Sequence, residues 1–395
     1  MTAAERRAGA SLAAIFALRM LGLFLILPVF AVHAREIPGG DDATLVGLAI
    51  GAYGLTQACL QIAFGAASDR YGRRPVILFG LLLFAAGSVV AALAADIHTI
   101  IAGRVLQGAG AISAAVTAWA ADLTREQHRT RIMAMIGASI GLVFAFSMVA
   151  APLLYAAIGM AGIFWLTALL ALGAMALAMR VPAPRTSPAP RGMGGTIGGI
   201  LRRGALMRLN FGVFALHVIQ TMMWVALPAA LVARGGLPLA AHWQVYLPAV
   251  LLSFVVMVPA VIAAERGGYL RPVFSGAVAL LALVQLGLYA WADSAWSIGL
   301  WLTLFFIAFN ILEAIQPSWI SRIVPPGIKG TALGVYNTLQ SAGLFFGGFA
   351  GGWLAQHFGG AGIGACCGAL ALVWLALAAT MAPPPPRMEP ARPRT

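Results

Sequence analysis

Charged residues are scarce in this sequence. Asp, Glu, Lys and Arg together make up 9% of the 395 residues, whereas hydrophobic residues make up 61%. A soluble globular protein carries roughly 25% charged residues, so this chain has too few charges to cover a water-facing surface. The same composition excludes a disordered chain, because disorder requires low hydrophobicity. These absences predict a protein that crosses a membrane many times.

Acidic residues and lysine are scarcer still. Twelve Asp and Glu stand against 25 Lys and Arg, which gives a net charge of +13, and Lys329 is the single lysine. A nucleic-acid-binding protein needs a polar surface to present such a charge, and the composition does not supply one. The residues before Lys329 do not fit the phosphate-binding loop of an ATPase. We therefore expect no nucleic-acid partner, no nucleotide and no cofactor.

Cysteine and histidine are also few. The three cysteines lie in apolar runs without metal-ligand spacing, and the six histidines form no H-E-x-x-H pattern, so no metal site is predicted. Gly137-Ala-Ser139-Ile-Gly141 fits the G-x-S-x-G pattern of hydrolases, but that motif requires a strand-turn-helix context. We interpret it as a small-residue packing face on a membrane helix, and expect no enzyme.

Long apolar runs are what the sequence has in abundance. Runs of about 18 residues or more predict membrane-spanning helices. Twelve such runs occur, at 11–33, 44–66, 76–95, 98–121, 132–155, 162–180, 207–233, 242–264, 272–291, 297–322, 332–355 and 361–381. The predicted fold class is therefore an all-α membrane protein with twelve transmembrane helices.

Basic residues collect in alternate connections between these runs. Most of the 25 lie in one set of connections or in the termini, while the opposite connections hold only Arg35 and Arg234. Lys and Arg accumulate on the cytoplasmic side of membrane proteins. Both termini are therefore expected in the cytoplasm.

A short charged segment recurs after the second and eighth runs. Asp69-Arg70-Tyr71-Gly72-Arg73-Arg74-Pro75 is matched by Glu265-Arg266-Gly267-Gly268-Tyr269-Leu270-Arg271-Pro272. Parallel repeats of this kind occur in transporters, so we predict two pseudo-symmetric six-helix bundles. They would comprise residues 1–180 and 207–381, joined by a Pro- and Gly-rich cytoplasmic linker at 181–206 and followed by a cytoplasmic tail at 382–395.

The loop after the second run also carries a family motif. Gly65-Ala-Ala-Ser-Asp69-Arg70-Tyr71-Gly72-Arg73-Arg74 matches the G-x-x-x-D-[RK]-x-G-R-[RK] signature of the major facilitator superfamily, which the chain therefore resembles. Gly65 would allow close helix approach, Gly72 a tight turn, and Asp69 a pairing with arginines or a helix N-terminus. The alternative is that these are ordinary basic residues of a cytoplasmic loop, together with a turn. The resemblance adds Asp122, so the predicted cytoplasmic gate comprises Gly65, Asp69, Arg70, Gly72, Arg73, Arg74 and Asp122.

A second motif lies in the fourth run. Arg104-Val-Leu-Gln107-Gly108 resembles the R-x-x-Q-G motif of the superfamily, whose role there is associated with proton transfer. An arginine within a membrane is costly and normally faces a cavity or a partner, and Gln107 is a candidate partner. A structural arginine that ties helix ends to backbone carbonyls is the alternative.

Four further segments resemble the YajR-type branch of the drug:proton antiporter family: Phe16–Gly22, Gly51–Gln57, Asp122–Gln127 and Asn310–Ser318. The resemblance covers the whole twelve-span region. It implies a proton-coupled exporter of the bacterial inner membrane with a central cavity lined by spans 1, 4, 7 and 10. Ala138, Ser147 and Ala151 stand where the antiporters have glycines before Pro152, which leaves the direction of transport open.

Glu313 is the only acidic residue expected in the middle of a span. An apolar environment favours the protonated form of a carboxyl, and an acid within a membrane is by default a functional-site hypothesis. His217 changes its charge near neutral pH. If Arg19 met both in one cavity, it would hold Glu313 ionised until substrate or movement separated them. A Glu hydrogen-bonded between helices and a satisfied buried His are the alternatives.

Polar and aromatic side chains inside the spans are candidates for the cavity lining. Aromatic rings with amides suit amphiphilic, moderately apolar solutes, although helix packing explains any single residue equally well. The predicted substrate-cavity residues are Tyr53, Gln57, Gln107, Trp119, Gln220, Trp224, Phe309, Asn310 and Asn337, and Gln61, Gln340 and Ser341 are read in the same way.

The favoured function is a proton-coupled secondary transporter that exports lipophilic or amphiphilic compounds by alternating access. Its expected partners are a small-molecule substrate, protons and the lipid bilayer. One chain with its complete set of twelve helices is expected to function as a monomer. One alternative is a symporter or facilitator that imports a metabolite such as a sugar or an organic acid. A non-transporting sensor or a membrane enzyme is the other.

Overall fold

The computed structural model describes residues 2–182, 199, 202–325 and 329–382, and within these ranges the chain is helical and contains no strand, as predicted. Most of the predicted linker and tail lie outside the described residues. The first half holds α1 (Ala3–Phe24), α2 (Leu27–His33), η1 (Ala34–Glu36), α3 (Ala43–Tyr71), α4 (Arg73–Ala92), α5 (Ile97–Ala109), α6 (Ser113–Asp122) and α7 (Glu126–Arg180). The second half holds α9 (Gly204–Ala233), η2 (Leu239–Ala241), α10 (Trp243–Arg266), α11 (Leu270–Ala290), α12 (Ala295–Ile323) and α13 (Lys329–Ala379).

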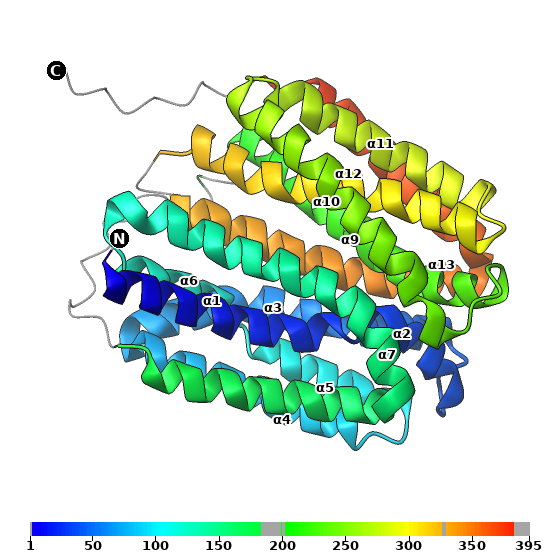
Figure 1. Ribbon diagram of the computed structural model, residues 1–395, viewed down its shortest axis with the longest axis horizontal. Coiled ribbons are helices and arrows are strands. Elements are labelled where there is room, and N and C mark those ends of the chain that lie inside the picture. Colours follow the sequence, from blue (N-terminus) through cyan, green and yellow to red (C-terminus); the bar gives the residue numbers. More distant parts are fainter. Residues whose placement is uncertain (1, 183–198, 200–201, 326–328, 383–395) are drawn as a thin grey trace.

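Two of these helices fold back on themselves. α7 runs for 55 residues and α13 for 51, whereas about 20 residues suffice to cross a bilayer. Each is interrupted by a glycine with positive φ, Gly159 at 66° and Gly359 at 62°, a conformation that side-chain-bearing residues rarely adopt. Ten stretches of the described chain are long and apolar enough to span a membrane. The reversals in α7, visible in Figure 1, and in α13 raise these to the predicted twelve crossings.

The two halves repeat one another. The order of buried and exposed positions along residues 161–182 is identical to that along residues 361–382. The starts of α3 at Ala43 and α10 at Trp243 are separated by the same number of residues as Gly159 and Gly359. The helices of the first half lie in the lower part of Figure 1 and α9 to α12 in the upper part. The predicted pair of pseudo-symmetric bundles is confirmed.

Two predicted spans are not continuous helices. The first is divided between α1, which ends at Phe24, and α2, which begins at Leu27 and has Pro28 in its first turn. The fourth is divided between α5 and α6, with Gly110 in the break. Apolar run length predicts that a segment lies in the membrane, but Pro lacks a backbone donor and Gly is a weak helix former. Both segments are confirmed as membrane spans, and the apolar run length alone did not indicate the interruptions.

Large apolar side chains cover the outside of the bundle. Exposed apolar patches of this extent mark a surface that contacts something other than water, and a bilayer supplies that contact. On α10 the exposed residues are Leu251, Leu252, Val255, Val256, Val258 and Ile262.

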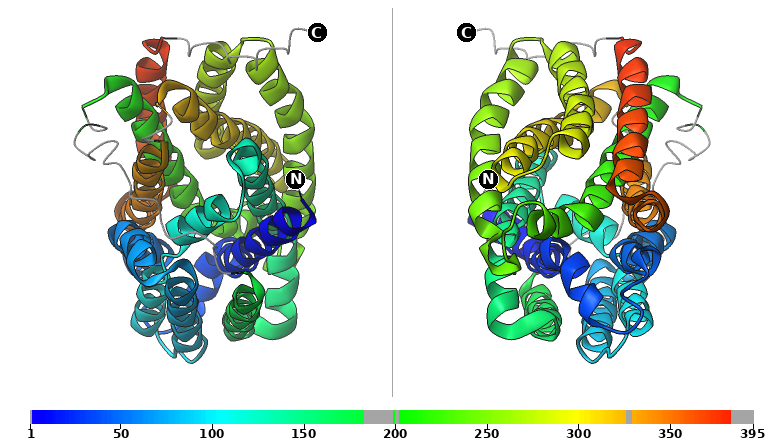
Figure 2. Two further views of the ribbon diagram at one scale, coloured as in Figure 1. Left: turned by 90° about the vertical axis from the view of Figure 1, so that its left-hand side faces the viewer. Right: turned by 90° about the vertical axis from the view of Figure 1, so that its right-hand side faces the viewer.

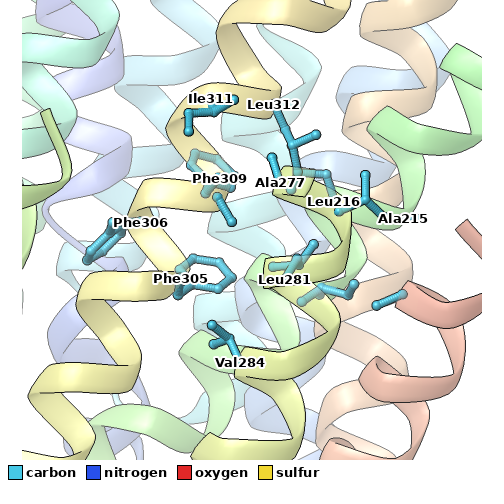
Figure 3. Packing of buried hydrophobic residues seen from close by; sticks show 14 of the residues in the cluster. Ala215, Leu216, Ala277, Leu281, Val284, Phe305, Phe306, Phe309, Ile311 and Leu312 are labelled. Atoms are coloured by element: carbon cyan, nitrogen blue, oxygen red, sulfur yellow. The ribbon is translucent and has the colours of Figure 1, made fainter. Parts of the chain in front are cut away.

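Apolar packing also fills the interior of each half. The largest cluster lies in the second half, where Phe305 and Phe309 of α12 lie near Leu281 and Val284 of α11 (Figure 3). Leu216 brings α9 into the same cluster. This packing holds α12 and α9 against each other and thereby positions the polar residues that both helices carry.

The predicted packing face at Gly137, Ser139 and Gly141 is only partly present. Ser139 Oγ lies 3.4 Å from the backbone oxygen of Ala13, so this position does contact α1. A Cβ added to Gly137 or Gly141 would meet nothing within 4 Å. The two glycines therefore do not serve close helix packing, and that part of the interpretation is wrong.

The two ends of the bundle differ in charge and in how the halves meet. We call the end that holds Arg73, Arg125, Arg271 and Arg322 the basic end, and the other the opposite end. α1 begins at the basic end, on the left of Figure 1, and Figure 2 views the bundle from each end.

The halves are joined through α3 and α13 in the middle and at the opposite end. Ala43 N donates to Gln356 Oε1 over 2.8 Å, and Gln57 Nε2 donates to Ser341 Oγ over 3.0 Å. Toward the basic end, a Cβ added to Gly334 of α13 would meet nothing within 4 Å. The two helices are thus in close contact at the opposite end, while this position of α13 lies free.

Gly47→Ala is expected to weaken the α3–α13 junction. The added Cβ would lie 2.1 Å from the backbone oxygen of Gly348, and overpacking of this kind costs about 1–3 kcal/mol. The substitution should favour a conformation in which the two helices separate. Spin labels at positions 41 and 357, in a background without native cysteines, should then show longer distances by double electron–electron resonance.

The matched control is Gly276→Ala on α11, where the added Cβ would meet nothing within 4 Å. Its distance distribution should equal that of the unsubstituted protein. Indistinguishable distributions for Gly47→Ala and Gly276→Ala would contradict the proposed role of the glycine contact.

Candidate functional site

Arg19 is the centre of a polar cluster inside the first half, and its side chain is buried. Nη2 donates to Tyr53 Oη over 2.6 Å, to Gln57 Oε1 over 3.0 Å and to the backbone oxygen of Gly110 over 3.1 Å. Nη1 donates to Ser113 Oγ over 3.2 Å. Gly110 lies in the break between α5 and α6, where the helical hydrogen-bond pattern stops. The break therefore supplies a backbone acceptor to a buried cation.

Arg104 is the second buried arginine of this half. Its Nη1 donates to Gln107 Oε1 over 2.8 Å, so Gln107 is the partner, as predicted. Nε and Nη2 reach the backbone oxygens of Ala49 and Ile50 at 3.2 and 3.3 Å, and Gln107 Nε2 donates to Ser88 Oγ. These contacts connect α5 to α3 and α4. They agree with the alternative in which Arg104 is a structural residue that binds backbone carbonyls.

Glu313 lies in the middle of α12, as predicted, and contacts α13 and α9. Gln340 Nε2 donates to Glu313 Oε1 over 3.1 Å and lies 2.8 Å from His217 Nε2. His217 Nε2 is 3.9 Å from Glu313 Oε2. The Phe309 ring, 5.9 Å from the imidazole between centroids, packs beside the pair. An acid, an imidazole and an amide from three helices thus share one site.

The two ring nitrogens of His217 have different neighbours. Nδ1 lies 2.9 Å from the backbone oxygen of Val213, which can only accept, so Nδ1 carries a proton. Nε2 faces the amide nitrogen of Gln340, which can only donate. The arrangement therefore fits Nδ1 as donor and Nε2 as acceptor.

Consecutive residues of α13 connect the two clusters. Gln340 contacts the Glu313 site, and Ser341 accepts from Gln57, which itself accepts from Arg19. The predicted meeting of Arg19, His217 and Glu313 in one cavity is therefore only partly observed. His217 and Glu313 adjoin, whereas the hydrogen bonds of Arg19 go to oxygens of its own half.

The predicted gate residues meet at the basic end. Arg73 is buried; its Nε donates to Asp122 Oδ2 over 2.8 Å, and its Nη1 donates to Ser68 Oγ and to Asp69 Oδ1. One guanidinium thereby joins the ends of α3 and α6 to the start of α4. Gly72, with φ of 94°, makes the tight turn between α3 and α4 that the motif predicts.

Other gate residues are placed differently. Arg70 is exposed, with its guanidinium carbon 5.3 Å from the centroid of the Tyr71 ring, and Arg74 is half-buried. A Cβ added to Gly65 would meet only Ala114 Cβ, at an ordinary 3.6 Å. The close helix approach expected at Gly65 is therefore absent from this structure, because the neighbouring helix leaves room for a side chain.

The second half has its own charge cluster where the sequence repeats. Glu265 Oε1 accepts from Ser318 Oγ over 2.6 Å, and Oε2 pairs with Arg322, so the ends of α10 and α12 are joined directly. Arg271 instead donates to the backbone oxygen of Ala379 over 2.7 Å. Glu265 thus corresponds to Asp69 of the first half, but in the described part of the chain it pairs with Arg322 of α12 and not with an arginine at the start of the next helix, as Asp69 does with Arg73.

A further ion pair at the basic end was not predicted. Arg125 Nε donates to Glu5 Oε1 over 2.8 Å and Nη2 to Oε2 over 3.1 Å, and this pairing raises the pKa of Arg125. Glu5 also accepts from the backbone nitrogen of Thr2 in a capping box. A Thr-x-x-Glu spacing is a signal from which the cap could have been predicted, but nothing in the sequence indicates Arg125 as the partner.

The remaining candidate residues are mostly enclosed. Trp119 and Trp224 have no exposed surface and belong to apolar clusters, so in this conformation they contribute to packing. Gln220 is buried, and Asn310 donates to Ser253 Oγ over 3.0 Å. Asn337 is half-buried. Serine partners such as Ser253 escaped prediction because a hydroxyl in an apolar run looks like any small packing residue.

Comparison with known proteins identifies the family. The sequence pattern described as Major Facilitator Superfamily matches residues 12–347 and 209–395. The chain belongs to the major facilitator superfamily. The inner membrane transport protein YajR of Escherichia coli (strain K12) is 46% identical over 389 residues, which cover 98% of this chain and 85% of that protein. The multidrug resistance protein MdtH of Aeromonas hydrophila is 26% identical, covering 84% of this chain and 82% of that one.

Solved structures share the major facilitator fold. The human organic anion transporter MFSD10 superimposes with a TM-score of 0.72 at 18% identity, covering 96% of this chain and all of the other. A D-xylose-proton symporter gives 0.71 at 16% identity, covering 93% and 96%. Family membership makes this chain a secondary transporter of small molecules and a multi-pass protein of the inner membrane. The enzyme and sensor alternatives are thereby set aside.

Arg73→Gln is expected to destabilise this major facilitator protein, because Asp69 and Asp122 lose their shared partner. Both acids are partly exposed, so the cost should lie between those of exposed and buried ion pairs, about 1–3 kcal/mol. Thermal unfolding of the purified protein measures the effect. Arg70→Gln, at an exposed position of the same motif, is the control, and equal shifts for both variants would contradict the bridging role of Arg73.

Proposed function

We propose that this protein is a proton-coupled secondary active transporter that exports lipophilic or amphiphilic compounds by alternating access. The observation that carries the proposal is the contact between Glu313 and Gln340, which places a mid-span acid beside His217 and on α13. α13 is also the helix that joins the second half to α3 of the first. Proton binding and the closure between the halves thus involve one helix.

The basic end is proposed to face the cytoplasm, because Lys and Arg accumulate on that side. Both termini would then be cytoplasmic. The α3–α13 junction through Ala43 and Gln356 would close the periplasmic side. In the alternate state this junction would part, and the residues predicted as the cytoplasmic gate, centred on Arg73, would lie next to a closed cytoplasmic side.

Protonation of Glu313 provides a way to couple the proton to this movement. A hydrogen bond to an ionised carboxylate is roughly twice as strong as one between neutral groups. Gln340 is therefore held more tightly while Glu313 is ionised than after it has taken up a proton. The neighbouring residue Ser341 accepts from Gln57 across the halves. Loosening Gln340 would thus act directly beside an inter-half contact.

His217 is suited to take part in the same step. Its Nε2 lies 3.9 Å from Glu313 Oε2 and 2.8 Å from the amide nitrogen of Gln340. A proton on Nε2 would turn this contact into an ion pair with Glu313. We propose Arg19 as the residue that holds the first-half side of the junction through Gln57, and Arg104 as an anchor of α5.

Aromatic rings near this site support an apolar or amphiphilic substrate. Phe144 of α7 lies between the halves, 5.2 Å from Phe24 of α1 and 6.2 Å from Phe309 of α12 by ring centroids. Aromatic faces accept apolar groups without demanding a fixed hydrogen-bond pattern. The likeness to MdtH, whose name describes multidrug resistance, agrees with such a substrate.

Import of a metabolite is the second candidate. Ala138, Ser147 and Ala151 replace the glycines that the antiporter family carries before Pro152 in the fifth span. Glu313 coupling serves either direction, so the imposed proton gradient decides between them.

Transport into proteoliposomes with an imposed pH gradient tests the proposal, using cationic dyes and small metabolites as solutes. We expect dye to move against its own gradient as protons move down theirs. Glu313→Gln should reduce this proton-driven movement to the level of liposomes without protein, because an amide cannot carry the proton.

Glu36→Gln is the matched control, since that carboxyl is exposed at the opposite end and should transport like the unsubstituted protein. Proton-driven dye export that survives in Glu313→Gln would refute the coupling role of Glu313. Proton-driven uptake of a metabolite without dye export would replace the favoured function with the second candidate.

A further inference from the structure

A cavity of about 670 Å³ opens at the opposite end of the bundle. Its walls come from both halves: α2, η1 and the start of α3 on one side, and the ends of α9 and α11 with the reversal of α13 on the other. It is distinct from the Glu313 site, whose residues are not among its walls. The volume lies within the range of about 300–1,000 Å³ that is usual for small-molecule sites.

The basic residues of this end converge on the cavity. Arg35 and Arg234 are the only Lys or Arg in the predicted connections at this end, and both line it. They occupy equivalent places in the repeat, since Arg35 follows the first span and Arg234 follows the seventh. Arginines are disfavoured on this side of a membrane protein, so two of them in one cavity call for a function.

Both guanidiniums have donors to offer. Among the described residues, neither guanidinium forms a hydrogen bond or an ion pair within the chain, and both residues are exposed. One carboxylate, that of Asp41, also lines the cavity. With two arginines and one aspartate, the cavity wall carries a net positive charge. The phenol of Tyr289 and the amide of Gln356 add neutral polar groups.

The rest of the wall is apolar and small. Much of it is formed by methyl-bearing residues of α9 and α13, and the glycines of the α13 reversal also line the cavity. These residues are Ala226, Ala229, Ala230, Ala233, Ala355 and Ile363. A hydrocarbon chain or ring can lie against such a wall while a charged head remains near the guanidiniums.

We propose that this cavity binds an amphiphilic anion, with its apolar part against the alanines of α9 and its carboxylate or phosphate between Arg35 and Arg234. Because the arginines belong to different halves, the bound anion bridges the halves at the opposite end. The proposal concerns binding alone and does not depend on the direction or coupling of transport.

Binding of tritiated decanoate to the purified protein, in nanodiscs of zwitterionic lipid, tests the proposal. Scintillation proximity should detect saturable binding that unlabelled decanoate displaces and decyltrimethylammonium, a cation of equal chain length, does not. Arg35→Gln combined with Arg234→Gln should weaken binding about tenfold, since each solvent-exposed charge contributes modestly. Arg7→Gln, at an exposed arginine of the basic end, should bind as the unsubstituted protein does.

A second variant tests the cavity without changing charge. Ala230→Phe fills the space beside the arginines and should also weaken decanoate binding, while elution as a single size-exclusion peak confirms that it folds. Unchanged affinity in both the double arginine variant and Ala230→Phe would overturn the proposal. Equal competition by decyltrimethylammonium would overturn the proposal as well, because the site would then not distinguish an anion from a cation.

Nanodiscs that contain phosphatidylglycerol distinguish the two sources of such an anion. If the lipid head group occupies the cavity, decanoate binding should fall in the unsubstituted protein and the decrease should vanish in the double arginine variant. Equal decanoate binding in the two kinds of nanodisc assigns the site to a free amphiphilic solute.

Discussion

The constraint on which the structure depends is that a polar group inside a membrane bundle must find its partners within the protein. Water does not reach the hydrocarbon region, so an unpaired charge there is costly. Arg19 shows how the chain meets this demand, because its donors reach a phenol, an amide, a hydroxyl and a backbone oxygen. The backbone oxygen is that of Gly110, in the break between α5 and α6. A buried charge and an interruption of a helix thus stabilise one another.

The same constraint gives α13 its place in the molecule. Its glycines approach α3 so closely that the backbones touch, and its polar residues Gln340 and Ser341 face different partners. One contacts an acid and an imidazole of the second half, and the other contacts Gln57 of the first. A change of charge at Glu313 therefore acts next to a contact that must break when the halves separate. The coupling we propose therefore passes through only these two adjacent residues, Gln340 and Ser341.

Local spacing explains which parts of the site were predictable. Gln107 follows Arg104 by three residues on one helix, so their contact follows from helical geometry. Asp69 and Arg73 lie on either side of the turn at Gly72, and the family motif indicated that they belong together. The partners of Arg19 come from α3, the α5–α6 break and α6, far apart in the sequence. The hydrophobic periodicity of a sequence does not predict contacts between residues of different helices. Gly65 shows the converse, since a motif position was expected to be tightly packed and the neighbouring helix leaves it room.

The sequence by itself determined the membrane class, the number of crossings, the repeat of two halves and the side on which charge collects. These follow from composition and run length, because a bilayer demands long apolar segments and biases the placement of Arg. Only the tertiary structure decided that His217 adjoins Glu313 while Arg19 does not, and that Arg35 and Arg234 share one cavity. Such meetings depend on how helices pack and cross, and packing is set by side-chain shape across helices that are distant in the chain.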